Sequence, residues 1–182
     1  LAELSEDGKN IEVISNGVDT EYFSKEIASS SACGETPHND EEDCLVFTGS
    51  MDWLPNNDAV IYFCREILPL IWQKNNQVKF YIVGRNPSGE LLNLAEKDKR
   101  IAVVGSVDDV RPYIAKAKVF VAPLRIGGGT RLKILEAFAM EKPVVSTTIG
   151  AEGIDYTEDK DILLADNPQS FADKVISLLA TI

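Results

Sequence analysis

Short runs of consecutive apolar residues recur along the chain, at residues 45–47, 80–83 and 119–122. Strands that read as continuous apolar runs, rather than as alternating apolar and polar residues, are typical of a parallel sheet whose two faces are both buried. The segments between these runs carry apolar residues at helical spacing. Strands that alternate with helices predict an α/β fold, here a Rossmann-like parallel sheet with helices on both faces.

The expected elements follow from these runs and from the turn residues between them. We expect strands over residues 11–15, 44–48, 78–83, 101–104, 118–124, 144–147 and 162–165. We expect helices over residues 57–73, 88–97, 108–117, 130–140 and 168–180. Most of the strands run into loops of small or polar residues, and open parallel sheets bind their ligands beyond the carboxyl ends of the strands. A ligand site is therefore expected at that edge.

The composition limits the classes of function. The 182 residues are 45% hydrophobic, which fits one ordinary globular domain, and no apolar run reaches the roughly 18 residues of a membrane span. A net charge of −11 argues against nucleic acid and against direct contact with an anionic membrane. Three cysteines without metal-ligand spacing predict reduced thiols, a cytoplasmic location and no metal site. Because the chain starts at Leu1 and not at a methionine, we expect it to be a piece of a longer protein.

A run of three glycines, 127–129, stands between an expected strand and an expected helix. Thr130 is the expected N-cap, so the loop amides and the amino end of the helix predict an anion site. Arg131 and Lys133 place two cations in the first helical turn, where the helix dipole disfavours them unless an anion is bound. Glu136 follows Lys133 by three residues, so the two are neighbours on the helix, and a solvated ion pair between them is the alternative explanation.

The same helix is expected to bury one stripe of apolar side chains. Leu132, Leu135, Phe138 and Ala139 recur at helical spacing and predict the buried face, with Ile134 at its edge. This assignment leaves the basic and acidic residues of the helix on the opposite face.

Several motifs occur together in one order along the chain. They are Asn-Gly-Val-Asp at 16–19, Val-Gly at 83–84, a glycine turn at 105, Gly-Gly-Gly-Thr-Arg-Leu-Lys-Ile-Leu-Glu-Ala-Phe-Ala at 127–139 and Lys-Pro-Val-Val at 142–145. This combination resembles the C-terminal half of a family 4, or group 1, glycosyltransferase with the two-domain GT-B fold. The resemblance implies a hinge segment and first strand region over 1–27, a flexible acidic loop over 28–43 and a nucleotide-sugar-binding domain over 44–182.

The resemblance also implies the reaction. A hexosyl group would pass from a nucleotide-diphospho-sugar, which is the donor substrate, to a saccharide or lipid-linked acceptor. Transfer would retain the anomeric configuration and need neither a cofactor nor a metal ion. The acceptor would be bound by an N-terminal domain that these residues do not include, so we expect the isolated chain to bind the donor and to transfer little or nothing.

The resemblance assigns roles to particular residues. It implies that Arg131 and Lys133 are the catalytic cations beside the diphosphate and that Glu136 binds the ribose hydroxyls. The other donor-binding residues that it implies lie along the phosphates, the base or the sugar, and they are Gly49, Gly84, Arg85, Val104, Val107, Gly127, Gly128, Gly129 and Thr130.

The chain departs from the family pattern at two places. Many members carry a glutamate eight positions before the second one, where this chain has Gly128, and a basic residue in the first strand-to-helix loop, where residues 50–56 contain none. We expect Arg131 and Lys133, with Arg85, to supply the missing charge. The alternatives are a GT-B-fold nucleotide-sugar epimerase and a non-catalytic nucleotide-binding or assembly module. A nicotinamide-binding domain is disfavoured, because residues 49–53 lack the Gly-x-Gly-x-x-Gly pattern.

Overall fold

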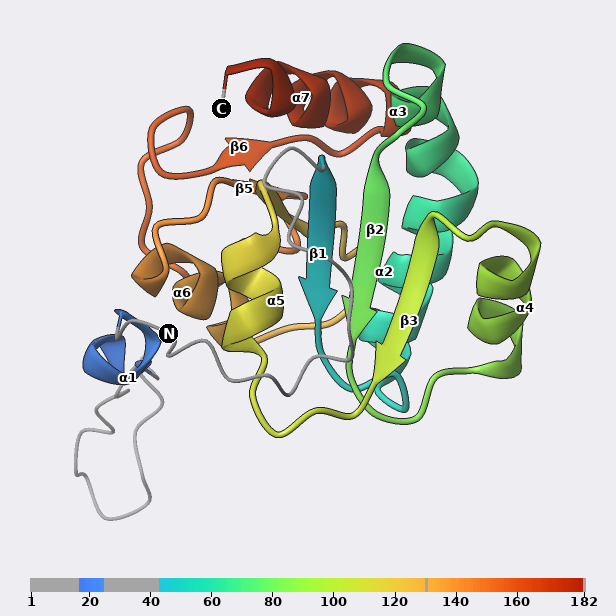
Figure 1. Ribbon diagram of the computed structural model, residues 1–182. Coiled ribbons are helices and arrows are strands. Elements are labelled where there is room, and N and C mark those ends of the chain that lie inside the picture. Colours follow the sequence, from blue (N-terminus) through green and yellow to red (C-terminus); the bar gives the residue numbers. More distant parts are fainter. Residues whose placement is uncertain (1–16, 25–42, 130, 182) are drawn as a thin grey trace, which may run out of the picture.

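A six-stranded parallel sheet forms the centre of the molecule (Figure 1). The computed structural model describes residues 17–24, 43–129 and 131–181, so the expected strand 11–15 and nearly all of the expected loop 28–43 lie outside the described residues. The strands are β1 Cys44–Thr48, β2 Lys79–Val83, β3 Ile101–Gly105, β4 Val119–Ala122, β5 Val144–Ser146 and β6 Leu163–Leu164, in the spatial order β3-β2-β1-β4-β5-β6. The predicted Rossmann-like α/β fold is confirmed.

The middle of the sheet is buried on both faces, as the apolar runs predicted. All five residues of β1 are buried, and Val46 pairs with Tyr81 of β2 on one side and with Phe120 of β4 on the other. Phenylalanines from the sheet and from the helices interlock around it, and the Phe63 and Phe80 ring centroids are 4.6 Å apart. Strands β1, β2 and β3 all end at the lower edge of the sheet in Figure 1.

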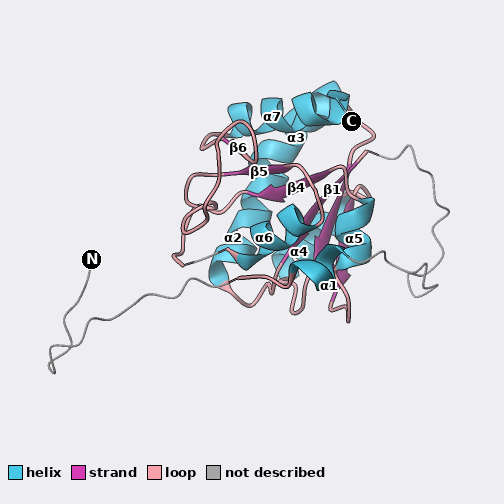
Figure 2. Cartoon of the chain, turned by 90° about the vertical axis from the view of Figure 1, so that its left-hand side faces the viewer, coloured by secondary structure: helices cyan, strands magenta, loops and turns pink. Residues whose placement is uncertain are grey.

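The helices are α1 Thr20–Ser24, α2 Leu54–Tyr62, α3 Leu68–Lys74, α4 Gly89–Lys97, α5 Arg111–Lys116, α6 Leu132–Ala139 and α7 Pro168–Thr181. In Figures 1 and 2, α5 lies on one face of the sheet and α2 with α3 on the other. Helix α7 packs against α3. No helix in the part of the chain that the structure describes combines the length and apolarity needed to traverse a bilayer.

The expected helix over 57–73 is wrong as one regular helix. It begins earlier, at Leu54, and a π-helical segment, Phe63–Ile67, separates α2 from α3. This wider turn falls immediately before Pro69, which has no N–H to continue the regular α-helical bonding. Ser88, in contrast, caps α4 as predicted, since its hydroxyl accepts a hydrogen bond from the Leu91 amide at 3.3 Å.

The predicted buried stripe of α6 is also wrong. The residues of this helix that are buried are Ile134 and Ala137, whereas Leu132 keeps 40% of its surface exposed. Leu135 and Phe138 are only half-buried. The smaller Ala137 is buried in their place, in a helix that packs against β5, so the helix is rotated relative to the prediction.

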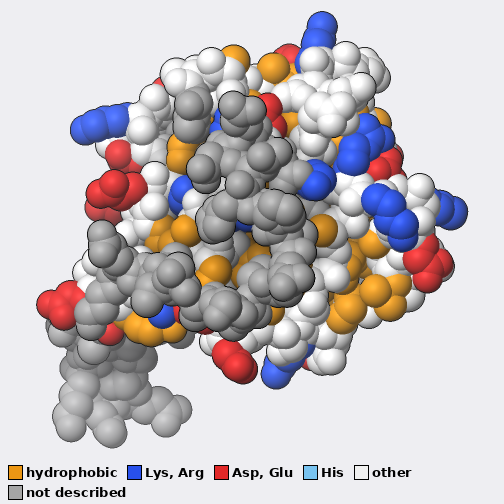
Figure 3. All heavy atoms as spheres, in the orientation of Figure 1, with side chains coloured by type: hydrophobic (Ala, Val, Ile, Leu, Met, Phe, Trp, Pro, Cys, Tyr) orange, Lys and Arg blue, Asp and Glu red, His pale blue; other side chains and the backbone are white. Residues whose placement is uncertain are grey.

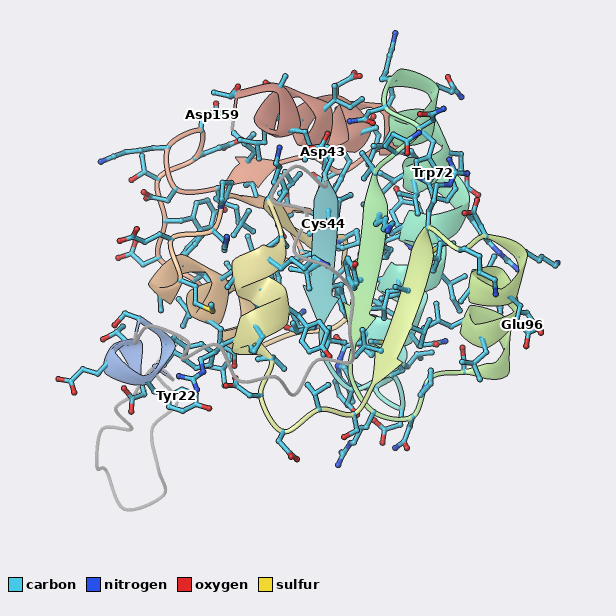
Figure 4. All side chains as sticks on the ribbon, in the orientation of Figure 1. Tyr22, Asp43, Cys44, Trp72, Glu96 and Asp159 are labelled. Atoms are coloured by element: carbon cyan, nitrogen blue, oxygen red, sulfur yellow. The ribbon has the colours of Figure 1, made fainter. Side chains whose placement is uncertain are left out.

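Helix α1 lies beside α6 and is held there by Arg111. The Arg111 guanidinium donates a hydrogen bond from Nη1 to the Tyr22 carbonyl oxygen at 2.7 Å and lies 3.9 Å from the centroid of the Tyr22 ring. Asp109 fixes the same guanidinium through a 2.7 Å ion pair. Tyr22 is seen below α5 in Figure 4, whereas Cys44 lies at the amino end of β1. Helix α1 thus packs near the carboxyl edge of the sheet.

Candidate functional site

A pocket of about 400 Å³ opens at the carboxyl edge of the sheet. Its walls come from the end of β1, the loop after it and the start of α2, from the residue before α5, from the second residue beyond β4 and from the first turns of α6. The lining residues are Thr48, Gly49, Trp53, Asn56, Val110, Leu124, Arg131, Leu132, Lys133 and Glu136. The structure therefore brings Gly49, Arg131, Lys133 and Glu136 of the predicted site together in one cavity.

Arg131 is a buried cation with unused donors. It is the N-cap residue of α6 and only 7% exposed. Its Nη1 donates to the Gly128 carbonyl oxygen at 2.9 Å, while Nε and Nη2 are buried and have no hydrogen-bond partner in the described residues. Burying charged donors without partners is costly. The unpaired Nε–Nη2 edge is a two-donor fork of the geometry that matches a carboxylate or a phosphate.

Lys133 points to the loop after β1 and not to solvent. Its Nζ donates to Asn56 Oδ1 at 2.7 Å and lies 4.0 Å from the centroid of the Phe47 ring. The pKa of Lys133 is lowered to about 7, mainly by burial and also by the nearby charge of Arg131, while Glu136 acts in the opposite direction. The amine is thus poised to take up a proton when an anion enters the pocket.

Glu136 stands one turn further along α6 on the pocket wall. It is half-buried, and burial raises its pKa while Lys133 opposes that rise. No ion pair within 4.0 Å joins these two described residues, so the alternative of a solvated Lys133–Glu136 pair is wrong. A carboxylate without a cationic partner at a pocket wall can accept hydrogen bonds from ligand hydroxyls.

Other predicted residues lie near the pocket without lining it. Arg85 is exposed, and its Nε donates to Ser50 Oγ at 2.8 Å. Val104 is the last residue but one of β3, Val107 lies two residues beyond the end of that strand, and both are half-buried. The glycine loop was expected to present its amides to a ligand, but Gly128 turns its carbonyl oxygen to Arg131.

A second hollow of about 500 Å³ lies on the other side of the glycine loop. Gly127 lines it, together with side chains such as Ile149 and Tyr156. Gly129 is exposed and lines neither hollow, and Thr130 lies outside the described residues. The glycine loop thus separates the two hollows. Its expected contact with a ligand stays a prediction.

Gly84 has a packing role that the sequence did not suggest. The Gly49 amide donates to the Val83 carbonyl oxygen at 2.9 Å, so the loops after β1 and β2 run in contact. A Cβ on Gly84 would lie 1.8 Å from the Gly49 carbonyl oxygen. Gly84 therefore lets the two loops that border the pocket approach each other.

We expect Gly84→Ala to lower the free energy of unfolding by about 1–3 kcal/mol, the usual range for overpacking a tightly packed position. Urea denaturation measures the loss. Gly89→Ala is the matched control, because nothing lies within 4 Å of a Cβ at that position. Equal stability of the two variants would contradict the contact between the loops.

Sequence reasoning missed several lining residues. Asn56, in the first turn of α2, was not among the expected site residues, and its place just beyond the carboxyl end of β1 was the available signal. Trp53 keeps 57% of its surface exposed at the pocket. Val110 and Leu132 join the lining through the positions of α5 and α6, which no local pattern specifies. Among the described residues no group of three or more His, Cys, Asp or Glu side chains is placed to hold a metal ion.

The surface around the sheet carries charges of both signs. In Figure 3 acidic and basic side chains are interspersed over the described part of the face shown. Among the described residues, Arg131 and Lys133, both in the pocket, have no carboxylate oxygen within 4.0 Å. The pocket is therefore the place where the geometry favours an anionic ligand.

Comparison with known proteins gives a family and a fold. Residues 42–181 match the family model described as glycosyl transferases group 1. An uncharacterized 44.6 kDa protein in the cps region of Klebsiella pneumoniae is 24% identical over 141 residues, which cover 73% of this chain and 36% of that protein.

Solved structures agree with this match at the level of the fold. A complex of S. aureus TarM with fondaparinux, α-GlcNAc-glycerol and UDP superimposes with a TM-score of 0.69 at 24% identity, over 96% of this chain and 33% of TarM. Anabaena HepE in complex with UDP and glucose gives a TM-score of 0.62 at 16% identity, over 91% of this chain and 46% of HepE. The chain thus spans about a third to a half of the length of these relatives.

Proposed function

The chain belongs to the group 1 glycosyltransferases, and we propose that it is the donor-binding half of such an enzyme, with the pocket at the carboxyl edge of the sheet binding a nucleotide-diphospho-sugar. One observation carries this proposal. Arg131, Lys133 and Glu136, two cations and a carboxylate, share one wall of a cavity of about 400 Å³. This charge pattern suits a ligand with an anionic diphosphate and a neutral hydroxylated sugar.

The two cations act on the diphosphate. The unpaired Nε–Nη2 edge of Arg131 is a bidentate donor for phosphate oxygens, and Lys133 adds a second charge. When the bond to the sugar breaks, negative charge develops on the departing nucleoside diphosphate. Cations that are fixed in a buried site stabilise that charge without reorganisation. We propose that this electrostatic assistance from the chain's own residues serves a retaining transfer that is independent of metal ions.

Glu136 acts on the nucleoside. Its carboxylate lies one helical turn beyond Lys133 and accepts hydrogen bonds from the two ribose hydroxyls. Since the TarM and HepE structures both contain UDP, we propose UDP as the first nucleotide to test. The transferred group is proposed to be a hexosyl unit and the acceptor a saccharide or a lipid-linked saccharide, bound by residues beyond this chain.

Calorimetric titration of the 182-residue chain tests the proposal. UDP, GDP, ADP and NAD are titrated in turn, and one nucleoside diphosphate is expected to bind with a 1:1 stoichiometry. Binding of NAD alone would overturn the proposal. A chain that binds none of the four would instead be an assembly module that only shares the fold.

We expect Glu136→Gln to weaken UDP binding by about tenfold or more, because a hydrogen bond to a charged group contributes about 1.5–3 kcal/mol. The melting temperature should change little, since Glu136 lies on the pocket wall and not in the core. The control is Glu141→Gln, an exposed carboxylate beyond the end of α6. The ribose assignment also requires that 2′,3′-dideoxy-UDP bind wild type and Glu136→Gln equally well. A large difference for that ligand would move Glu136 away from the ribose.

A further inference from the structure

The loop after β1 has no basic residue of its own. Residues 50–56 contain one charged side chain, Asp52, although the loop borders the pocket proposed to hold a diphosphate. Cations from elsewhere in the chain reach this stretch: the exposed Arg85 contacts Ser50, and Lys133 of α6, 77 residues further along the chain, contacts Asn56. The long-range contact of Lys133 places a positive charge where the local sequence supplies none.

A hydrogen bond to the Ser50 carbonyl oxygen fixes the orientation of the Asn56 side chain. Asn56 is only 7% exposed, and its Nδ2 donates to the Ser50 carbonyl oxygen at 2.8 Å. Since a carbonyl oxygen can only accept, the amide nitrogen must face Ser50 and the amide oxygen must face the pocket. That oxygen accepts from Lys133 Nζ at 2.7 Å.

Gly49 and Phe47 complete the enclosure of the amine. A Cβ on Gly49 would lie 2.7 Å from both Asn56 Nδ2 and Lys133 Nζ, so only a glycine leaves room for this pair. The Phe47 ring centroid lies 4.0 Å from the same Nζ and forms a cation–π contact. The amine is therefore held at one place beside the end of β1. The charged groups that act on it electrostatically are Arg131 and Glu136.

We propose that Asn56 is a positioning residue, whose side-chain amide, oriented by the Ser50 carbonyl, holds the Lys133 amine at the loop after β1 so that it meets the diphosphate there. The inference rests on the proposed function and adds a residue that the family assignment does not name. Asn56 is the third residue of α2 and caps nothing, because the N-cap of α2 is Trp53 and has no side-chain cap. A purely structural role would weaken the loop regardless of what stands at position 133.

A double-mutant cycle separates positioning from structure. UDP and uridine affinities are measured for Asn56→Ala, Lys133→Met and the double variant. Asn56→Ala is expected to weaken UDP binding about fivefold and uridine binding hardly at all, and to have no further effect once Lys133 is methionine. The control is Asn57→Ala, the neighbouring asparagine that does not line the pocket. An equal loss in both Lys133 backgrounds, or an equal loss for uridine, would overturn the inference.

A second measurement does not depend on UDP. The titration of the Lys133 amine is followed by NMR with ¹³Cε-labelled lysine, and its signal is assigned by its absence in Lys133→Met. Asn56→Asp is expected to move that titration to higher pH by one unit or more, because it replaces the amide oxygen with a carboxylate next to Nζ. If UDP fails to bind but this shift is seen, the proposed function fails and the contact stands. An unchanged titration would show that Asn56 does not hold the amine.

Discussion

Arg131→Met is expected to lower the affinity for UDP by about 100-fold while leaving the free protein at least as stable as the wild type. The loss of affinity follows from the two donors of the unpaired Nε–Nη2 edge. Hydrogen bonds to charged groups contribute about 1.5–3 kcal/mol each, and about 1.4 kcal/mol is a factor of ten in affinity. The stability follows from the same atoms. In the free protein Nε and Nη2 are buried without partners in the described residues, and methionine removes this unfavourable burial.

The experiment combines calorimetry with thermal melting. Uridine should bind Arg131→Met as well as it binds the wild type, because the nucleoside has no phosphate for the arginine to grip. Arg65→Met is the matched control: Arg65 is exposed, pairs with Glu90 at 2.8 Å and does not line the pocket, so its loss should change UDP affinity less than about twofold. A clear drop in the melting temperature of Arg131→Met would mean that the hydrogen bond of Arg131 to Gly128 stabilises the fold by more than the buried, unpaired donors destabilise it.

A binding residue that destabilises its own free state is expected at functional sites. The sequence pointed to this conflict, because Arg131 and Lys133 stand in the first turn of a helix, where the dipole disfavours cations. The structure shows that both cationic groups are also buried, which makes the charged side chains still less favourable in the free protein. Both cations gain their most favourable environment only when an anion occupies the pocket.

The sheet could be predicted because its signal is local. A parallel strand that is buried on both faces is apolar along most of its length, and β1 and β4 satisfy this condition within a few residues each. The carboxyl edge of the sheet then follows from topology, and with it the place of the pocket. Fold and site location therefore required no long-range information.

The details of the site could not be predicted because they depend on packing between distant segments. The buried residues of α6 are Ile134 and Ala137, as the packing of the helix on the rest of the fold requires, and the largest apolar residues of the helix gave the wrong face. The alternative explanation for Lys133 was a partner within its own helix, Glu136, whereas its hydrogen-bond partner is Asn56, 77 residues earlier. The sequence around Asn56 carries no sign of such a contact.

Binding of UDP and stability of the free protein are expected to depend on pH in opposite directions above pH 7. Burial lowers the pKa of Lys133 from 10.5 to about 7, so between these values the unfolded chain binds a proton at this residue that the folded chain does not. Stability therefore rises with pH across this window. The bound diphosphate favours the charged amine and raises its pKa, so UDP affinity falls as pH increases above 7, by at most about tenfold per pH unit.

Calorimetry between pH 6 and 9 in buffers of different ionisation enthalpy measures this linkage, because binding should take up close to one proton at pH 8. Terminal phosphate ionisation near pH 6 limits affinity on the acid side, so the strongest binding is expected between about pH 6 and 7. Lys133→Arg is the decisive variant. Its side chain stays protonated throughout the range, so the decline above pH 7 and the proton uptake should both disappear. A decline that persists in Lys133→Arg would assign the titration to another group and remove Lys133 from the diphosphate site.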